Sequence, residues 1–260
     1  MNVDAACDLP TRYHLTEHHY FAAICPLHRR YSADINAYFT DEHAGSCDLL
    51  FVRVGSAALD ETMAAPLDLI RRLSLDIRIV VHEQRVVGLC EVLTGFGFQP
   101  AEQTTAMVLE LSRFAPAISE EDVQIKLTRN LNEWAVPMRS AYSMQTDIAV
   151  HYQARHQRAL DADETLYHFT LSAEGQVRGS LTLSLCEDEA RLNDVGTLSG
   201  FGGRGYATRL IQVALLHAVS LGARRCFLEA SVGALSLYQK LGFERLFDYQ
   251  AFTRGALAGP

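Results

Sequence analysis

A glycine-rich segment near the C-terminal end of the chain carries the strongest chemical signal in the sequence. It reads Gly200-Phe201-Gly202-Gly203-Arg204-Gly205-Tyr206-Ala207-Thr208 and lies between an expected strand and an expected helix. Glycine adopts backbone conformations closed to other residues and lets a ligand approach the backbone closely. The backbone N–H groups at the start of a helix have no intrahelical partner and bind anions. The segment therefore predicts a site for a phosphorylated ligand.

Two other classes of nucleotide site share features with this segment. The phosphate loop of nucleoside triphosphatases requires Gly-Lys-Ser or Gly-Lys-Thr, and neither follows here. Gly200, Gly202 and Gly205 do satisfy the G-x-G-x-x-G pattern of dinucleotide-binding domains, and Glu229 ends the next expected strand. The first strand of such a domain is a continuous apolar run, whereas residues 190–197 interleave polar residues. An NAD-dependent oxidoreductase therefore remains only as an alternative.

The same residues resemble the GNAT family of N-acetyltransferases over about residues 166–254. In that family a strand ending in Val-x-Thr precedes Gln or Arg, two variable residues, Gly, one variable residue, and Gly or Ala. This chain has Val195-Gly196-Thr197 and then Gly202-Gly203-Arg204-Gly205-Tyr206-Ala207, with Gly202 in place of Gln or Arg. A second family motif, Asn or a substitute, then Ala, then Tyr before Leu-Gly-Phe, resembles residues 231–243, with Ser231 in place of Asn.

The resemblance implies direct transfer of an acetyl group from acetyl-coenzyme A to an amine, with no covalent enzyme intermediate. It assigns backbone groups of Val195, Gly196 and Thr197 to the acetyl carbonyl and the pantetheine arm, where they would stabilise developing negative charge. It places Ser231 in the donor site and makes the Tyr238 phenol the acid that protonates the departing thiolate. The expected pyrophosphate site consists of Gly202, Gly203, Arg204, Gly205, Tyr206, Ala207 and Thr208.

An ammonium acceptor must lose a proton before it attacks, so a base is required. Asp194 is the candidate, with Glu229 behind it, although an aspartate on a strand beside a turn also serves as a local hydrogen-bonding residue. Trp134 and Tyr142 flank a loop that shapes the acceptor pocket in many family members; core packing is the alternative. The altered residues Gly202 and Ser231 leave open a non-catalytic acyl-coenzyme A binding protein.

The elements around these residues alternate between helix and strand, which predicts an α/β (α+β) chain. With the resemblance, this becomes a GNAT acyl-CoA N-acyltransferase fold in tandem arrangement with mixed central sheets. A helix is expected over residues 11–39, bent or ended by Pro26, and another from Ser119 past Trp134, ended by Pro137.

The pattern at residues 67–81 repeats at residues 214–229, which indicates a duplicated module. We expect a degenerate GNAT-like domain over residues 1–115 and an acetyltransferase domain over residues 116–260. Leu93 occupies the position that corresponds to Tyr238, and no glycine cradle precedes Leu67. Only the second half is therefore expected to be active.

Composition limits the partners. The 260-residue chain has a formal net charge of -8 and a pI near 5.7, which argues against nucleic acid, because phosphate-backbone binding needs clustered Lys and Arg. No stretch approaches a membrane span. We expect a cytoplasmic enzyme, monomer or homodimer, whose partners are acetyl-CoA and an amine. His14-Leu15-Thr16-Glu17-His18 matches a zinc-peptidase pattern, but no distal ligand is indicated, so no metal is expected.

Overall fold

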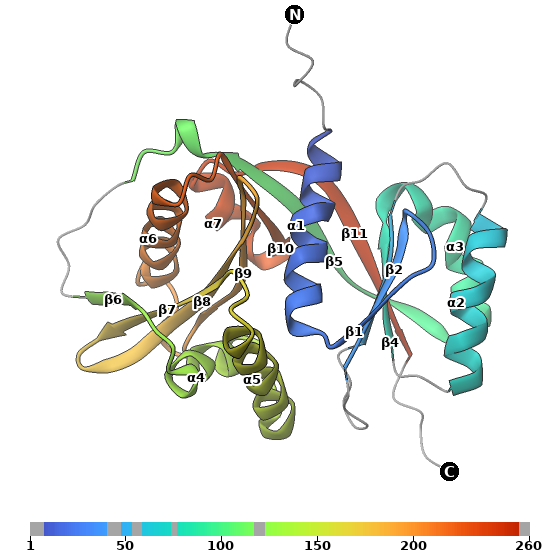
Figure 1. Cartoon of the computed structure of the whole chain (residues 1–260), viewed down its shortest axis with the longest axis horizontal. Helices are drawn as coiled ribbons and strands as arrows, with labels where there is room; N and C mark the ends of the chain where they lie inside the picture. Colours follow the sequence, from blue (N-terminus) through green and yellow to red (C-terminus); the bar gives the residue numbers. More distant parts are fainter. Residues whose placement is uncertain (1–7, 41–47, 54–58, 74–76, 117–122, 255–260) are drawn as a thin grey trace, which may run out of the picture. The chain divides into compact units, whose positions relative to one another are not determined.

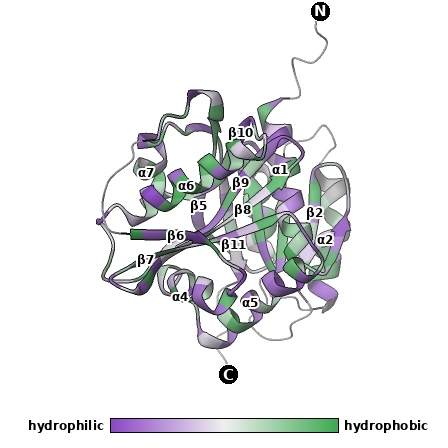
Figure 2. Cartoon of the chain, turned by 60° about the vertical axis from the view of Figure 1, so that its left-hand side comes forward, coloured by the Kyte–Doolittle hydropathy of each residue, from purple (hydrophilic) through white to green (hydrophobic). Residues whose placement is uncertain are grey.

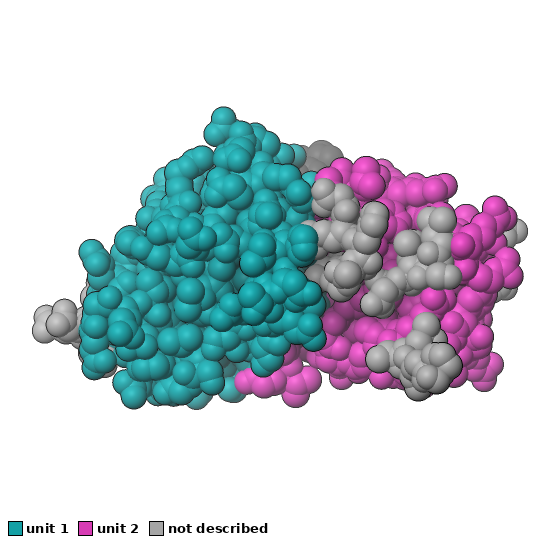
Figure 3. All heavy atoms as spheres, turned by 90° about the horizontal axis from the view of Figure 1, so that it is seen from below, with its two compact units in different colours: residues 1–24, 107–229, 234–246 teal, residues 25–106, 230–233, 247–260 magenta. Residues whose placement is uncertain are grey.

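The structure of the protein is a computed structural model that describes residues 8–40, 48–53, 59–73, 77–116 and 123–254. These residues form two compact units (Figure 3). Unit 1 consists of the described parts of residues 1–24, 107–229 and 234–246. Unit 2 consists of the described parts of residues 25–106, 230–233 and 247–260. The strands β5 (Phe98–Glu110) and β11 (Glu244–Arg254) contribute residues to both units.

Unit 1 is a mixed sheet covered by helices (Figure 1). Its strands follow the order β5-β10-β9-β8-β7-β6, with antiparallel pairs from β6 to β9 and a parallel pair of β9 with β10. The helix α6 connects that parallel pair, as a crossover must. The elements of this unit are α1 (Leu9–Ile24), β6 (Val123–Leu127), α4 (Leu131–Ala141), α5 (Thr146–Asp161), β7 (Leu166–Ala173), β8 (Gln176–Cys186), β9 (Glu189–Thr197), α6 (Tyr206–Ser220), β10 (Arg225–Ser231) and α7 (Leu235–Lys240).

The two faces of strands β7, β8 and β9 differ in polarity although both are buried. Alternate residues of a strand point to opposite faces. On one face Phe169 contacts His217 of α6, and on the other His168 contacts Trp134 of α4. The buried side chains of the α6 face are Phe169, Leu171, Leu181, Leu183 and Leu192. Those of the opposite face are His168, Thr170, Ser180, Thr182, Ser184 and Arg191.

Buried polar groups normally require hydrogen-bond partners, and such a face is costly to form. The helices that cover the polar face, α1, α4 and α5, alternate hydrophobic and hydrophilic residues, as the hydropathy colouring shows (Figure 2). Their inward-facing polar side chains contact the strands: Tyr13 of α1 receives a hydrogen bond from Arg191 at 3.2 Å. The polar interior of unit 1 is therefore shared between helices and sheet.

Unit 2 contains a second mixed arrangement. Its strands follow the order β1-β2-β3-β4-β11, and β3 and β4 are parallel. A core of apolar side chains, among them Ile79, Leu93 and Phe98, packs between the strands and the helices. The elements are β1 (Leu27–Arg30), β2 (Ile35–Phe39), β3 (Asp48–Val52), α2 (Leu59–Leu73), β4 (Ile77–His82) and α3 (Glu83–Gly95). Short 3-10 turns occur at Leu111–Arg113 and Val232–Ala234.

The mixed α/β organisation is confirmed, but two predicted helices are wrong in part. The helix expected over residues 11–39 ends at Ile24, and two strands of unit 2 follow it. Pro137 does not end its helix but lies inside α4, where its side chain is buried. The start expected for that helix near Ser119 lies outside the described residues. No helix in the described ranges is long and apolar enough to cross a membrane.

The compact units do not follow the expected division into residues 1–115 and 116–260. Helix α1 is grouped with the C-terminal elements in unit 1. Its Arg12 donates a hydrogen bond of 2.7 Å to Glu189, and Arg225 of β10 pairs with the same carboxylate at 2.6 Å. These contacts join residues 177 positions apart, which no local sequence pattern reports.

Candidate active site

Strand β9 is interrupted at Asp194. Ser180 of β8 is paired with Gly196, and Thr182 is paired with Asn193, so Asp194 and Val195 together lie opposite one residue. This is a β-bulge, which commonly re-aims side chains near functional sites. Asp194 has a φ of 55°, a left-handed conformation that costs energy for a residue other than glycine. The bulge turns the Asp194 side chain into the polar interior.

The parallel pairing of β9 with β10 ends just before this bulge. It runs from Glu189 and Arg225 to Leu192 and Leu228, although β9 itself continues to Thr197. Beyond Leu192, the β10-side backbone edge of β9 is not engaged in this ladder. Unpaired strand edges accept extended chains as partners. The predicted donor residues Val195, Gly196 and Thr197 lie in this stretch.

Gly196 has a structural reason to be glycine. A Cβ atom there would lie 3.0 Å from Met138 Cα and 3.1 Å from the Pro137 carbonyl oxygen of α4. The backbone of α4 therefore packs directly on β9 beside the bulge. The C-terminal residue of this helix, Tyr142, donates a hydrogen bond to the Val195 carbonyl oxygen at 3.4 Å.

The glycine-rich turn adopts backbone conformations that require glycine. Gly200, Gly203 and Gly205 have φ values of 83°, 76° and 74°. Gly205 is the N-cap of α6 and no side chain caps that helix, so its first N–H groups are available to an anion. Gly202 has no positive φ and open space around it, so the fold does not explain its lack of a side chain.

Three guanidinium groups lie at this turn. Those of Arg178 and Arg204 lie over the ring of Phe201, 3.8 Å and 4.9 Å from its centroid. A Cβ atom at Gly205 would lie 3.8 Å from Nη2 of Arg209, on the first turn of α6. Arginine suits phosphate recognition because its donors form a planar fork. Sequence analysis found Arg204 but missed Arg178 and Arg209, because Arg178 comes from β8.

Tyr238 and Tyr142 lie at the same site. Tyr238 of α7 is 6% exposed and contacts Phe243 edge-on. Burial raises the pKa of Tyr238, and the nearby Cys226 adds to this. The pKa of Tyr142 is also raised, by surrounding atoms and by the charges of Asp194, Tyr238 and Glu229. Both phenols therefore keep their protons at neutral pH. Trp134, by contrast, is a fully buried core residue.

Two tyrosines from distant helices hold the Asp194 carboxylate. Tyr20 of α1 donates to Oδ2 at 2.8 Å, and Tyr152 of α5 donates to Oδ1 at 2.7 Å. The Asp194 side chain is only 10% exposed. Burial raises its pKa above the ordinary value, and the hydrogen bonds from Tyr152 and Tyr20 oppose that rise in part. A carboxylate with a raised pKa is a stronger base at neutral pH.

Glu229 lies beside a buried arginine. Arg191 is 2% exposed, and its Nη2 lies 3.8 Å from Glu229 Oε2. Tyr13 donates a hydrogen bond of 3.4 Å to the same oxygen. Burial opposes the charge of Arg191, but Tyr13, Glu17 and Glu229 outweigh it and raise its pKa. The Glu229 carboxylate is thus paired with a cation, whereas Asp194 receives neutral donors.

The remaining predicted residues are placed less informatively. Ser231 is exposed at the end of β10 and is grouped with unit 2. In the His14-to-His18 pattern, His14 lies 3.7 Å from Glu17. Within the described residues, no group of three or more His, Cys, Asp or Glu side chains is arranged to hold a metal ion.

A sequence model of the Acetyltransferase (GNAT) family matches residues 128–243. Residues 128–243 form a GNAT acetyltransferase domain. The match spans β9 with its bulge, the glycine-rich turn and Tyr238. The protein is accordingly an acyltransferase, and the GNAT domain lies within unit 1 except for four residues, 230–233.

Solved structures agree on the fold. A GCN5-related N-acetyltransferase from Kribbella flavida has a TM-score of 0.71 at 16% identity, covering 96% of this chain and 97% of that one. A GCN5-related N-acetyltransferase from Sphaerobacter thermophilus has a TM-score of 0.63 at 15% identity, with 84% and 76% coverage. A tandem GNAT protein from the clavulanic acid biosynthesis pathway has 0.60 at 16%, with 87% and 79% coverage. The sequence matches no curated protein.

Proposed function

We propose that the GNAT domain transfers an acetyl group from acetyl-CoA directly to an amine. The observation that carries this proposal is the end of β9–β10 pairing at Leu192, immediately before the Asp194 bulge and the glycine-rich turn. An extended pantetheine arm needs an unpaired strand edge, and a pyrophosphate needs a helix N-terminus. Here β9 offers the edge and leads directly to α6.

The donor site combines backbone and cationic groups. Residues Gly202 to Thr208 present N–H groups at the start of α6, and Arg178, Arg204 and Arg209 supply positive charge beside them. This charge offsets the absence of Gln or Arg at position 202. Ser231 remains a further candidate for the donor site.

The chemistry requires one base and one acid. Asp194, with its raised pKa, would accept the proton of the ammonium group before attack on the acetyl carbon. The tetrahedral intermediate would be stabilised by backbone groups of Val195 to Thr197. Tyr238, which keeps its proton, would donate it to the departing thiolate. Tyr142 is a second phenol close enough to Tyr238 and Asp194 to influence both.

We also propose that unit 2 is an eroded copy of the same module. In unit 1 the order β9, α6, β10, α7 contains a parallel strand pair, and in unit 2 the order β3, α2, β4, α3 contains another. Leu93, at the position that corresponds to Tyr238, is fully buried and has no proton to give. The proposed activity therefore belongs to unit 1 alone.

Thermal shift with acetyl-CoA and with NAD tests the donor class. We expect acetyl-CoA to raise the unfolding temperature and NAD to leave it unchanged; stabilisation by NAD alone would exclude acetyl-CoA as the donor. Thiol release across an amine panel then separates an enzyme from an acyl-CoA binding protein. Tyr238→Phe should lower kcat about 100-fold without weakening donor binding. Equal activity of the two proteins would remove Tyr238 from the mechanism.

A further inference from the structure

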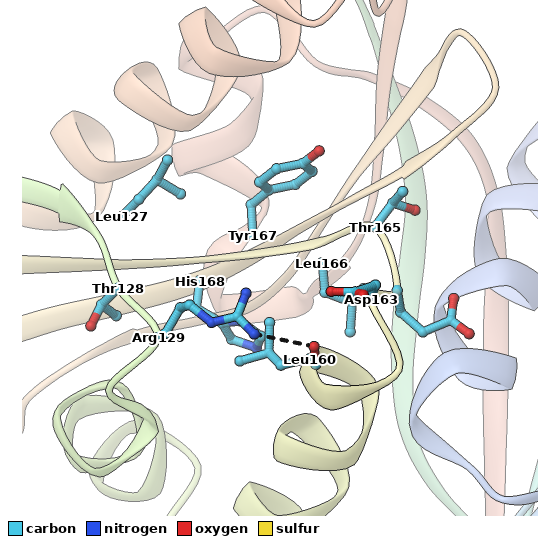
Figure 4. Close-up of a pocket in the computed structure, with 10 residues that line it drawn as sticks. Leu127, Thr128, Arg129, Leu160, Asp163, Thr165, Leu166, Tyr167 and His168 are labelled. Carbon is cyan, nitrogen blue, oxygen red and sulfur yellow. Dashed lines mark hydrogen bonds between the residues drawn. The ribbon is translucent and has the colours of Figure 1, made fainter.

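Two histidines connect Asp194 to a pocket in unit 1. His156 Nε2 lies 3.6 Å from Asp194 Oδ2, and His156 Nδ1 lies 2.8 Å from His168 Nε2. The two imidazoles are at most 1% exposed. His168 in turn lines a pocket of about 310 Å³ (Figure 4). A continuous series of ring nitrogens therefore joins the candidate base to this pocket.

The far end of the series is an unsatisfied nitrogen. His168 Nδ1 is buried and has no hydrogen-bond partner among the described protein atoms. Arg129, which lies in the same pocket and donates to the Leu160 carbonyl oxygen at 3.2 Å, is close enough to act electrostatically on His168. The pocket is lined by Leu127, Thr128, Arg129, Leu160, Asp163, Glu164, Thr165, Leu166, Tyr167 and His168.

Aromatic side chains enclose the two imidazoles. The ring of Trp134 lies 4.5 Å from that of His156 and 5.0 Å from that of His168. The Tyr152 ring lies 4.9 Å from that of His156. A buried nitrogen without a partner costs free energy, so a packed interior that keeps one has a use for it. Packing alone would be served as well by an apolar side chain.

Both histidines are neutral at physiological pH. Burial lowers the pKa of His156 and of His168 to about 3, and each ring then carries one proton. A 2.8 Å bond between two neutral imidazoles needs a donor and an acceptor, so the position of one proton fixes that of the other. A carboxylate at Asp194 favours the proton on His156 Nε2, whereas a protonated Asp194 favours it on Nδ1.

We propose that His156 and His168 form a relay that carries the proton taken up by Asp194 to the pocket beside Arg129. The proposal rests on the proposed function of Asp194 as the base. It assigns His156 and His168 to the reaction as positioning residues, since neither touches the acceptor.

The transfer balances without any other reactant. With Asp194 protonated, each imidazole carries its proton on Nδ1. Asp194 passes its proton to His156 Nε2, His156 Nδ1 passes one to His168 Nε2, and His168 Nδ1 releases one to water in the pocket. Asp194 is again a carboxylate, and both imidazoles are neutral with the proton on Nε2. Rotation of each ring about its Cβ–Cγ bond restores the starting arrangement.

The coupling can be measured without turnover. We would label the full chain with ¹⁵N-histidine and determine which ring nitrogen of His168 is protonated, assigning its signals with His168→Gln. In the wild type we expect Nε2. In Asp194→Asn the amide nitrogen can donate to His156, and we expect Nδ1 in both rings. The same protonated nitrogen of His168 in both proteins would overturn the relay, whether or not the protein acetylates amines.

Kinetics test the relay in the reaction. His168→Ala opens the relay to the pocket, and we expect kcat to fall at least about tenfold while KM for acetyl-CoA is unchanged. Added imidazole should restore kcat through the pocket. His217→Ala, which removes another histidine of unit 1, is the control and should keep full activity. An unchanged kcat in folded His168→Ala, or a loss that imidazole does not restore, would contradict the relay.

Discussion

Two parts of the chain repeat one order of elements, and they differ at the point where chemistry is expected. In unit 2, β3 pairs with β4 along its whole length, from Asp48 and Ile77 to Val52 and Val81. In unit 1, β9 pairs with β10 only as far as Leu192, and five more residues of β9 follow. The same strand-helix-strand pattern therefore gives a closed ladder in one unit and an interrupted one in the other.

The interiors differ in the same sense. The core of unit 2 that contains Leu93 is built from apolar side chains. The polar face of unit 1 buries Asp194, His156 and His168, which stabilise the fold less than apolar groups would. Comparison of the two units teaches that the polar groups and the bulge are additions to a scaffold that folds without them. They are expected where function, rather than stability, determines the residue type.

The largest effect should come from the turn that only unit 1 has. Gly205→Val places a branched side chain at a positive φ beside Arg209, and we expect acetyl-CoA binding to weaken by at least about 100-fold, because several charged hydrogen bonds are lost. Gly175→Val is the matched control, since Gly175 has nearly the same φ, 73°, in a hairpin turn. Calorimetry should show normal binding for the control; equal losses would mean that strain alone is responsible.

A smaller effect should come from the contact between α4 and β9. Gly196→Ala places a Cβ atom 3.0 Å from the backbone of Met138, and we expect a loss of about 1–3 kcal/mol in the free energy of unfolding. Gly202→Ala has open space and should leave stability unchanged. Urea unfolding of both variants measures this. A stable Gly196→Ala protein would show that α4 moves freely away from the bulge.

The smallest effect should be the acid sensitivity of unit 1. The pKa of His156 and His168 is about 3 in the folded protein and near 6.5 when unfolded, so the unfolded chain binds more protons between these values. Their contribution is complete above pH 6.5 and is lost as the pH falls toward 3, by at most about 1 kcal/mol per pH unit for each ring.

Comparison with His168→Gln isolates this contribution, because Asp194, whose raised pKa acts in the opposite direction, is present in both proteins. Urea unfolding between pH 7 and pH 4 should give a shallower pH dependence for the variant. Parallel curves would show that His168 is protonated in the folded state.

Local signals predicted the donor side of the site. The glycines, the strand before them, α6 and the Tyr238 helix all follow from residues close in sequence, because turn and cap conformations depend on a few neighbours. The structure adds Arg178 and Arg209 to that side. The role of each residue stays a prediction.

The acceptor side could not be read from the sequence in the same way. Tyr20 and Asp194 are 174 residues apart, and the histidine pair joins a helix to a strand. The short strands β1 and β2 were taken for helix, since their apolar residues fit both periods. Pro137 was expected to end α4, but its buried side chain and the packing of its carbonyl oxygen near Gly196 keep it within the helix.

The stoichiometry of acetyl-CoA binding tests the central claim most directly. Isothermal titration of the full chain should give one site per chain, and Gly205→Val should abolish it while Gly175→Val preserves it. Two sites would contradict the assignment of the donor to unit 1 alone. No binding, or binding that Gly205→Val leaves intact, would contradict the donor site at the N-terminus of α6.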